Sequence, residues 1–196
     1  MNSNVYVTVM AAAVVDGNYY YAYQNNGVVE NVVDHICDEM RLYDRETFRT
    51  TLIGLNKLDN VVIVSTAKTY SDMGKLLSKY HNLNKEHIIV HDSAMFAYKG
   101  DVMVRVINEN VSRETLNKEF GGKVFVLMGG KRVFDAIQPD TAIVTEFAIP
   151  TGQQQRFLTN GIATKPLKKY KRGETFKRCT FGNWKVRSMY LTDLSE

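Results

Sequence analysis

The stretch Val124-Phe-Val-Leu-Met-Gly-Gly-Lys-Arg-Val-Phe134 decides the fold. It opens with an apolar run, which is typical of a strand buried on both faces, and a helix-like segment follows two glycines. Glycine lets the backbone approach a ligand closely, and the free N–H groups at a helix start favour an anion. Because Lys131 and Arg132 add positive charge, the stretch predicts a phosphate or pyrophosphate site at the turn Gly129-Gly130.

The glycine spacing separates this turn from two common nucleotide-binding motifs. The Rossmann fingerprint requires G-x-G-x-x-G, and a P-loop requires G-x-x-x-x-G-K-[ST]. Residues 124–134 contain neither pattern. A different dinucleotide-binding fold is therefore expected.

Strand-like and helix-like segments alternate on both sides of this turn. Such alternation predicts parallel middle strands joined by right-handed crossovers. The tail instead predicts an antiparallel hairpin around Gly182-Asn183. Apolar patterning and capping residues give strands at 5–15, 60–65, 87–91, 102–107, 123–128, 141–149, 175–181 and 184–191, and helices at 44–55, 71–80, 112–120 and 132–137, with Asp44, Ser71 and Ser112 as N-caps.

These segments predict an α/β fold with a mixed, mostly parallel central sheet flanked by helices and a C-terminal antiparallel hairpin. A length of 196 residues is enough for one domain and short for two, so a single domain over residues 1–196 is expected.

Composition is that of a soluble globular protein, with 44% hydrophobic and 23% charged residues. No run approaches the ~20 apolar residues of a membrane helix, and the N-terminal apolar run reads as a first strand rather than a signal peptide. Cys37 and Cys179 form no disulfide framework, and neither they nor the four histidines have metal-ligand spacing. We therefore expect a cytoplasmic protein with no membrane partner and no metal.

Net charge is modest, at +4, and residues 165–178 supply much of it. A basic run of this kind is usually a solvated loop, and it can also help to attract an anionic ligand. We do not expect a nucleic-acid partner.

Continued through Thr145 to Ile149, the opening stretch resembles the dihydrofolate reductase family. In that family a strand ends in Ile-Gly-Gly, a short helix carries Tyr or Phe, and the next strand carries Thr. The resemblance implies that the Gly-Gly backbone contacts the nicotinamide and pyrophosphate, and that Thr145 hydrogen-bonds the catalytic carboxylate and, through water, the pterin. The positions assigned to the cofactor by this turn are Met128, Gly129, Gly130, Lys131, Arg132, Val133 and Phe134.

A second match, at residues 61–70, resembles the family's strand followed by Gly-Arg-Lys-Thr-Trp/Tyr, and it implies phosphate contacts from Lys68 and Thr69. Thr66 stands where the family has Gly, and Ala67 where it has Arg. His91 and Ser93 fall where the family binds the adenosine 2′-phosphate, beside Asp92, which would repel it. The resemblance implies NADPH as cofactor, with NADH left open.

Substrate contacts are also implied by the resemblance. Ala12 corresponds to the alanine whose backbone contacts the pterin amino group, with Ala11 or Ala13 as the alternatives if the match is shifted by one residue. Ala12 is also assigned to the cofactor. Lys85 takes the place of the arginine that grips the glutamate tail, although lysine makes no bidentate fork. Thr145 and Phe48 are the remaining positions that the resemblance assigns to the substrate.

The catalytic carboxylate has more than one candidate. Asp44-Arg-Glu-Thr-Phe48 keeps the family's Asp-x-x-x-Phe spacing, which puts acid and ring on one helical face. Asp38 lies at a more fitting distance from Asp16-Gly17, and Glu39 is a third candidate. The family's Leu-Pro-Trp is absent, and Gln153 stands where the family has aspartate in a loop that supports closure.

Taken together, the resemblance implies NADPH-dependent reduction of 7,8-dihydrofolate to tetrahydrofolate, a step that supports thymidylate synthesis. The departures suggest a divergent, phage-like member, which would act in the host cytoplasm as a monomer or homodimer on a small pterin or folate. Two alternatives stay open: a riboflavin-pathway-type pyrimidine reductase, and a catalytically silent copy that serves as a binding or structural protein.

Overall fold

The computed structural model describes residues 3–15, 18–21, 36–58, 60–66, 69, 87–90, 104–107, 111–129, 133, 136–153 and 170–193. The chain divides into two compact units: Met1–Val9 with Arg49–Asp140, and Met10–Phe48 with Thr141–Glu196. Strand β1 (Val5–Val15) and helix α1 (Asp38–Asn56) contribute residues to both units. Each unit is described by itself.

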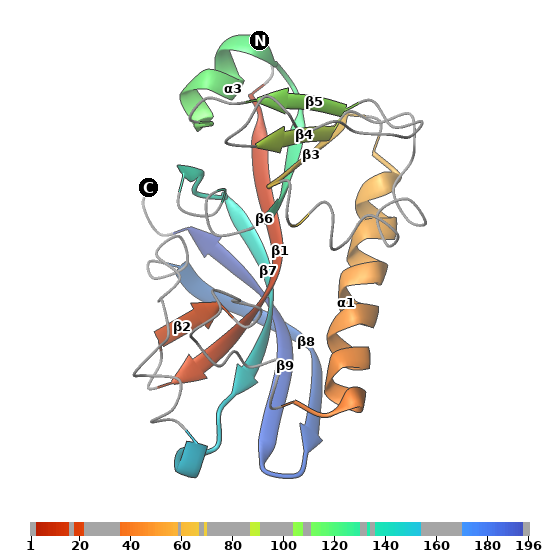
Figure 1. The fold of residues 1–196 in the computed structure, drawn as a ribbon, viewed down its shortest axis with the longest axis vertical. Helices are drawn as coiled ribbons and strands as arrows, with labels where there is room; N and C mark the ends of the chain where they lie inside the picture. The colour runs from red at the N-terminus through yellow and green to blue at the C-terminus, as the bar shows by residue number, and fades with distance from the viewer. Residues whose placement is uncertain are drawn as a thin grey trace. The chain divides into compact units, whose positions relative to one another are not determined.

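The first unit holds a parallel sheet, whose central strand β3 (Val61–Thr66) is fully buried along its first five residues. In Figure 1 the strands β3, β4 and β5 lie side by side, next to helix α3. The hydrogen-bonded order is β5 (Val104–Ile107), β4 (His87–Val90), β3, β6 (Val124–Gly129) and the first half of β1, with every pair parallel.

Helix α3 (Arg113–Glu119) begins where the sequence predicts. The Thr115 backbone N–H donates to Ser112 Oγ at 3.2 Å, and the Thr115 hydroxyl lies within hydrogen-bonding distance of the Ser112 backbone N–H. This reciprocal pair is a capping box, which satisfies two backbone donors at the helix start. The predicted N-cap at Ser112 is confirmed.

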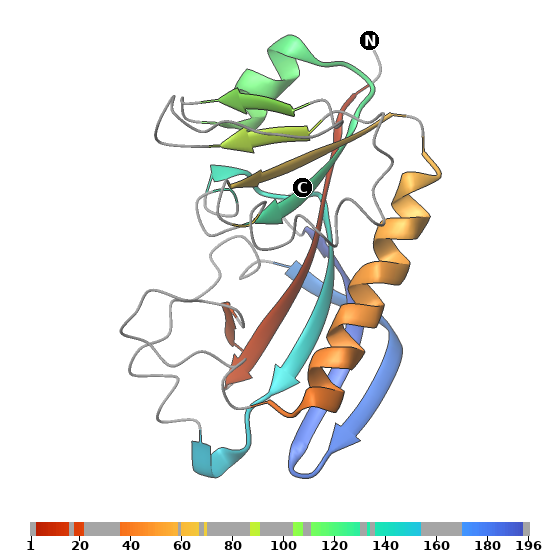
Figure 2. The ribbon, with the colours of Figure 1, turned by 45° about the vertical axis from the view of Figure 1, so that its right-hand side comes forward.

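The second unit holds an antiparallel sheet. Strand β7 (Thr141–Ala148) pairs with β9 (Trp184–Asp193), which pairs with β8 (Tyr170–Phe181); β2 (Asn18–Tyr21) pairs with β1. The β8–β9 hairpin is the long pair of strands in Figure 2. It turns at Gly182, whose φ of 57° lies in the left-handed region that glycine adopts without strain.

Two apolar clusters cover the two faces of this second sheet. One contains Ala11, Ala13, Ile36, Met40, Tyr43, Phe147, Ile149, Trp184 and Val186, and it is the cluster in which α1 takes part. The other contains Ala12, Tyr19, Ala142, Val144, Met189 and Leu191. Because side chains alternate along a strand, Thr145 and Ser188 lie on the α1 face, and Glu146 and Arg187 lie on the opposite face.

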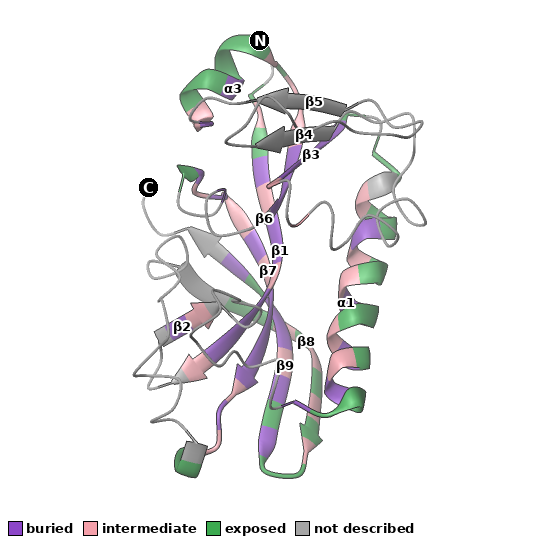
Figure 3. Cartoon of the chain, in the orientation of Figure 1, coloured by how far each residue is buried: buried purple, intermediate pink, exposed green. Residues whose placement is uncertain are grey.

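Helix α1 begins at Asp38, so the prediction of a helix start at Asp44 was wrong. The Arg41 N–H bonds to the Cys37 carbonyl, which closes the first turn there, and Asp38 and Glu39 stand in that turn. Negative charge in the first turn is favourable to a helix. Asp44 therefore lies inside the helix, whose two sides differ in exposure along its length (Figure 3).

The predicted fold class is confirmed: a mixed sheet, parallel in its middle strands, ends in an antiparallel C-terminal hairpin. Strand β2 was not predicted, and β8 begins at Tyr170, five residues before the expected start. The predicted helix at 71–80 lies outside the described residues, and the single domain over 1–196 stays a prediction. Within the described part of the chain, none of the helices has the length and apolar character that crossing a membrane requires.

Candidate functional site

Three acidic residues on α1 are candidates for the catalytic carboxylate, and their environments differ. Asp38 is 98% exposed and lies 3.9 Å from Arg41, a surface pairing that is worth little. Hydrogen bonds from its own backbone N–H and from Cys37 hold the pKa of Glu39 below its ordinary value. A general acid needs the opposite shift, so Glu39 is the less suitable proton donor.

Asp44 lies on the inward side of α1. Successive helical residues are about 100° apart, which places Asp44 and Phe48 about 40° and 80° around the helix from the buried Met40. Both are only partly buried, whereas Met40 and Thr47 beside them are fully buried. The Asp44 carboxylate and the Phe48 ring, one turn apart, therefore lie on the inward side of α1 and are still partly exposed.

Thr145 lies on the sheet face that α1 covers, and it is buried. Its hydroxyl and that of Ser188, directly opposite on β9, are 3.0 Å apart. Ala11 and Ala13 share this face, and Ala12 belongs to the cluster on the other face. Sequence reasoning missed Ser188; the alternation of the predicted hairpin strand was the signal that could have placed it opposite Thr145.

Tyr43 packs against the β8–β9 hairpin. Its ring is edge-on to Phe181 at 6.1 Å between centroids, and the Lys177 ammonium lies 4.1 Å from the ring centroid. The hydroxyl is buried, and Ser188 is its polar neighbour. Burial raises the pKa of Tyr43, and the neighbouring Ser188 opposes that shift.

A buried ion pair, which sequence reasoning also missed, lies on the opposite face. Glu146 is only 4% exposed at its side chain, and Arg187 Nε donates to its Oε2 at 2.5 Å. The Tyr19 hydroxyl donates to the other carboxylate oxygen. The buried carboxylate thus accepts two hydrogen bonds on the side of the sheet away from α1.

In the first unit, two of the residues assigned to the cofactor, Gly129 and Thr69, lie at or just after the carboxyl ends of neighbouring strands. Gly129, at the end of β6, pairs with Ser65, and the register between these strands shifts just before that pair. After β3, the Thr69 N–H donates to the Thr66 hydroxyl at 3.3 Å, and the two hydroxyls are 3.1 Å apart. Ligands bind at the carboxyl ends of strands in open α/β sheets, so this edge suits a phosphate-bearing group.

Two further residues assigned to the cofactor are described. Met128 is buried in β6, and Val133 is buried at the start of a helical turn that the Ile137 N–H closes at 3.0 Å. This turn agrees with part of the predicted helix at 132–137. The other assigned positions lie outside the described residues: Lys68, Lys85, His91, Ser93, Gly130, Lys131, Arg132 and Phe134.

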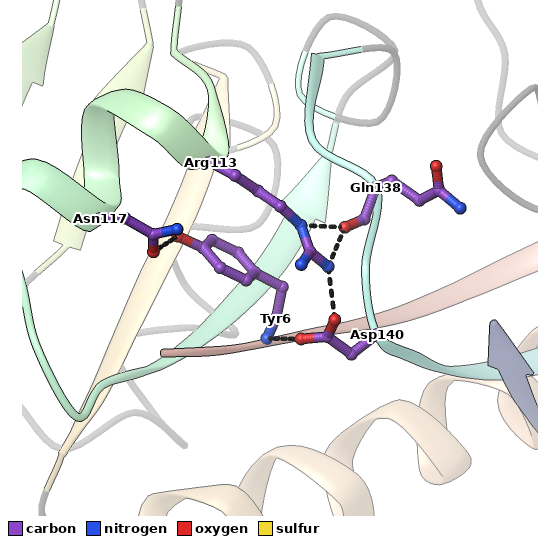
Figure 4. A network of polar contacts seen from close by, with 5 residues as sticks. All are labelled: Tyr6, Arg113, Asn117, Gln138 and Asp140. Carbon is purple, nitrogen blue, oxygen red and sulfur yellow. Dashed lines mark hydrogen bonds and ion pairs between the residues drawn. The ribbon is translucent and has the colours of Figure 1, made fainter. Parts of the chain in front are cut away.

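A polar network occupies the opposite end of the first unit (Figure 4). The Arg113 guanidinium donates to the Gln138 carbonyl and to Asp140, whose carboxylate also accepts from the Tyr6 N–H at 2.8 Å. The Tyr6 hydroxyl donates to Asn117 at 2.7 Å. Tyr6 is the second residue of β1, so the network holds the amino end of a strand and is structural rather than part of a ligand site.

Comparisons with known proteins bear on the fold. No protein-family model matches the chain, and no curated protein matches it. Among solved structures, the dihydrofolate reductase of Schistosoma mansoni is similar with a TM-score of 0.55 and 14% sequence identity, over 98% of this chain and 100% of that chain. The chain therefore has a dihydrofolate reductase-like fold.

Proposed function

We propose that this chain is an oxidoreductase that transfers a hydride from NADPH to 7,8-dihydrofolate, forming tetrahydrofolate. The fold supports the reaction class. The observation that carries the proposal is the pair Asp44 and Phe48, one turn apart on the inward side of α1 and only partly buried. That arrangement is suited to an acid that binds a heteroaromatic ring and a side chain that packs against it.

The proposed chemistry has two parts, the cofactor and the acid. The reduced nicotinamide, when bound, supplies the hydride. In the first unit Gly129 and Thr69 would hold the cofactor, since both follow the carboxyl ends of neighbouring strands. In the second unit Asp44 would hold the proton destined for the ring nitrogen and orient the ring through a hydrogen bond.

One observation favours a second candidate, a catalytically silent protein that binds a nucleotide. The Thr145 hydroxyl is 3.0 Å from the Ser188 hydroxyl, and no contact between Thr145 and a carboxylate is present among the described residues. In an active enzyme the resemblance implies that this threonine bonds the catalytic acid. Ser188 would then have taken over the position of that acid as the partner of Thr145.

The test is turnover with NADPH and dihydrofolate, followed by the loss of reduced-nicotinamide absorbance. Asp44→Asn keeps the size of the side chain and removes the acid, and Asp38→Asn is the matched control on the same helix. Turnover that Asp44→Asn abolishes and Asp38→Asn leaves intact supports the proposal. The reverse result moves the acid to Asp38, and NADPH binding without turnover of any pterin favours the silent protein or a reductase of another substrate.

A further inference from the structure

The Lys177 side chain joins β8 to two successive turns of α1. Its ammonium lies 4.1 Å from the centroid of the Tyr43 ring and donates to Thr47 Oγ1 at 3.4 Å. The Thr47 hydroxyl in turn donates to the Tyr43 carbonyl at 3.0 Å. One cation thus holds a ring and a hydroxyl that are four residues apart on one flank of the helix.

An irregularity in β8 brings Lys177 to this face. Thr175 pairs with Met189 and Lys177 pairs with Ser188, so β8 has one extra residue, Phe176, between them. In a regular ladder Lys177 would pair with Arg187 on the other face, a position that Arg178 takes in the structure. Bulges re-aim side chains in this way and are frequent beside functional sites.

The hairpin contacts of Tyr43 lie on one flank of α1. Tyr43 meets Lys177 and Phe181, both of which belong to the edge strand β8. Asp44 follows Tyr43 by about 100° around the helix, and Phe48 follows Thr47 by the same angle. Both therefore lie on the flank of α1 turned away from β8, and a small rotation of the helix would carry them out of position together.

We propose that Lys177 is a positioning residue for Asp44 and Phe48: by clamping Tyr43 and Thr47, it sets the rotation of α1 that presents the acid and the ring to substrate. The proposal rests on the proposed function. A cation above a tyrosine ring that also donates a hydrogen bond orients a helix better than an apolar contact does, because both interactions depend on where the ammonium sits.

Three variants of the full chain test the clamp. Lys177→Met keeps an unbranched stem but loses the charge and the donors, Lys177→Arg keeps both, and Lys185→Met removes an exposed lysine from the same hairpin as a control. Each is measured for kcat with dihydrofolate, for the dissociation constant of NADPH, and for hydrogen exchange of the backbone amides at residues 40–48.

We expect Lys177→Met to lower kcat on the order of fivefold, since slight misplacement of a catalytic group slows the chemical step. NADPH affinity is expected to be unchanged, and Lys177→Arg is expected to restore kcat. A purely stabilising role would lower the melting temperature without changing kcat of the folded protein. An unchanged kcat in Lys177→Met, with active wild type, overturns the proposal.

Absence of turnover in the wild type would be a failure of the proposed function, not of the clamp. Hydrogen exchange then decides alone. Faster exchange at residues 40–48 in Lys177→Met, but not in Lys185→Met or Lys177→Arg, supports the clamp. Equal exchange in all three variants overturns it.

Discussion

Removal of the buried ion pair between Glu146 and Arg187 is expected to destabilise the second unit far more than removal of a surface charge. The Glu146 side chain is 4% exposed and that of Arg187 is 32% exposed. Leaving one buried partner of such a pair uncompensated costs about 3–5 kcal/mol. Because Arg187 is one-third exposed, we expect about 3 kcal/mol for Arg187→Met, near the lower end of that range.

Glu146→Gln keeps the shape of the side chain but removes the charge that Arg187 and Tyr19 both bond. Hydrogen bonds to charged groups contribute about 1.5–3 kcal/mol, so the expected loss is about 2 kcal/mol. The double variant should lose less than the sum of the two single variants, since each single change already breaks the same contact. The coupling between interacting sites of this kind is about 1 kcal/mol or more.

Urea unfolding followed by the fluorescence of Trp184 measures these values. Trp184 is the only tryptophan of the chain and is buried in the same unit, so its signal reports the unit that holds the ion pair. Arg178→Met is the control, because Arg178 is exposed and lies directly opposite Arg187 on β8. Equal losses for Arg187→Met and Arg178→Met, or strict additivity in the double variant, would refute the reasoning.

Three further changes have defined outcomes. Gly173→Ala should destabilise by about 1–3 kcal/mol in denaturant unfolding, because its Cβ would lie 2.8 Å from the Tyr190 carbonyl oxygen, whereas Gly152→Ala, with nothing within 4 Å, should not. Ser112→Ala should lower the free energy of unfolding by about 1 kcal/mol through loss of the N-cap. Thermal melting followed by circular dichroism measures this loss, and an unchanged melting curve would contradict it. Burial raises the pKa of Tyr43, so the folded state keeps a proton that the unfolded state loses; stability should fall as pH rises above 10.0, and less steeply in Tyr43→Phe.

Much of the fold could be predicted from sequence because its strands are strongly patterned. The apolar run that ends at Gly129 predicts a buried strand even when its neighbouring strands are unknown. Ser112 caps its helix through a capping box, which is a local pattern. The start of α1 was mispredicted because an acid in the interior of a helix and a capping acid look alike in sequence. Only the packing of Met40 and Tyr43 shows that the helix already runs through residues 38–43.

The candidate site was harder to predict because its contacts are made between distant segments. Thr145 meets Ser188 only through the register of β7 and β9, and no local pattern specifies that register. Lys177 reaches α1 because a bulge shifts it to that face, and such irregularities leave no clear trace in composition. Asp44 could be nominated from its spacing to Phe48, but its inward position depends on the rotation of the whole helix.

The most direct test of the proposed function is to follow the hydride itself. Wild-type protein is mixed with dihydrofolate and NADPH that carries deuterium at the transferable position, in separate reactions for the two epimers, and the product is examined by mass spectrometry. We expect tetrahydrofolate that carries deuterium from one epimer alone, with no such product from Asp44→Asn. Unlabelled product from both epimers, or no product from either despite bound NADPH, would contradict the proposal that this fold performs hydride transfer to dihydrofolate.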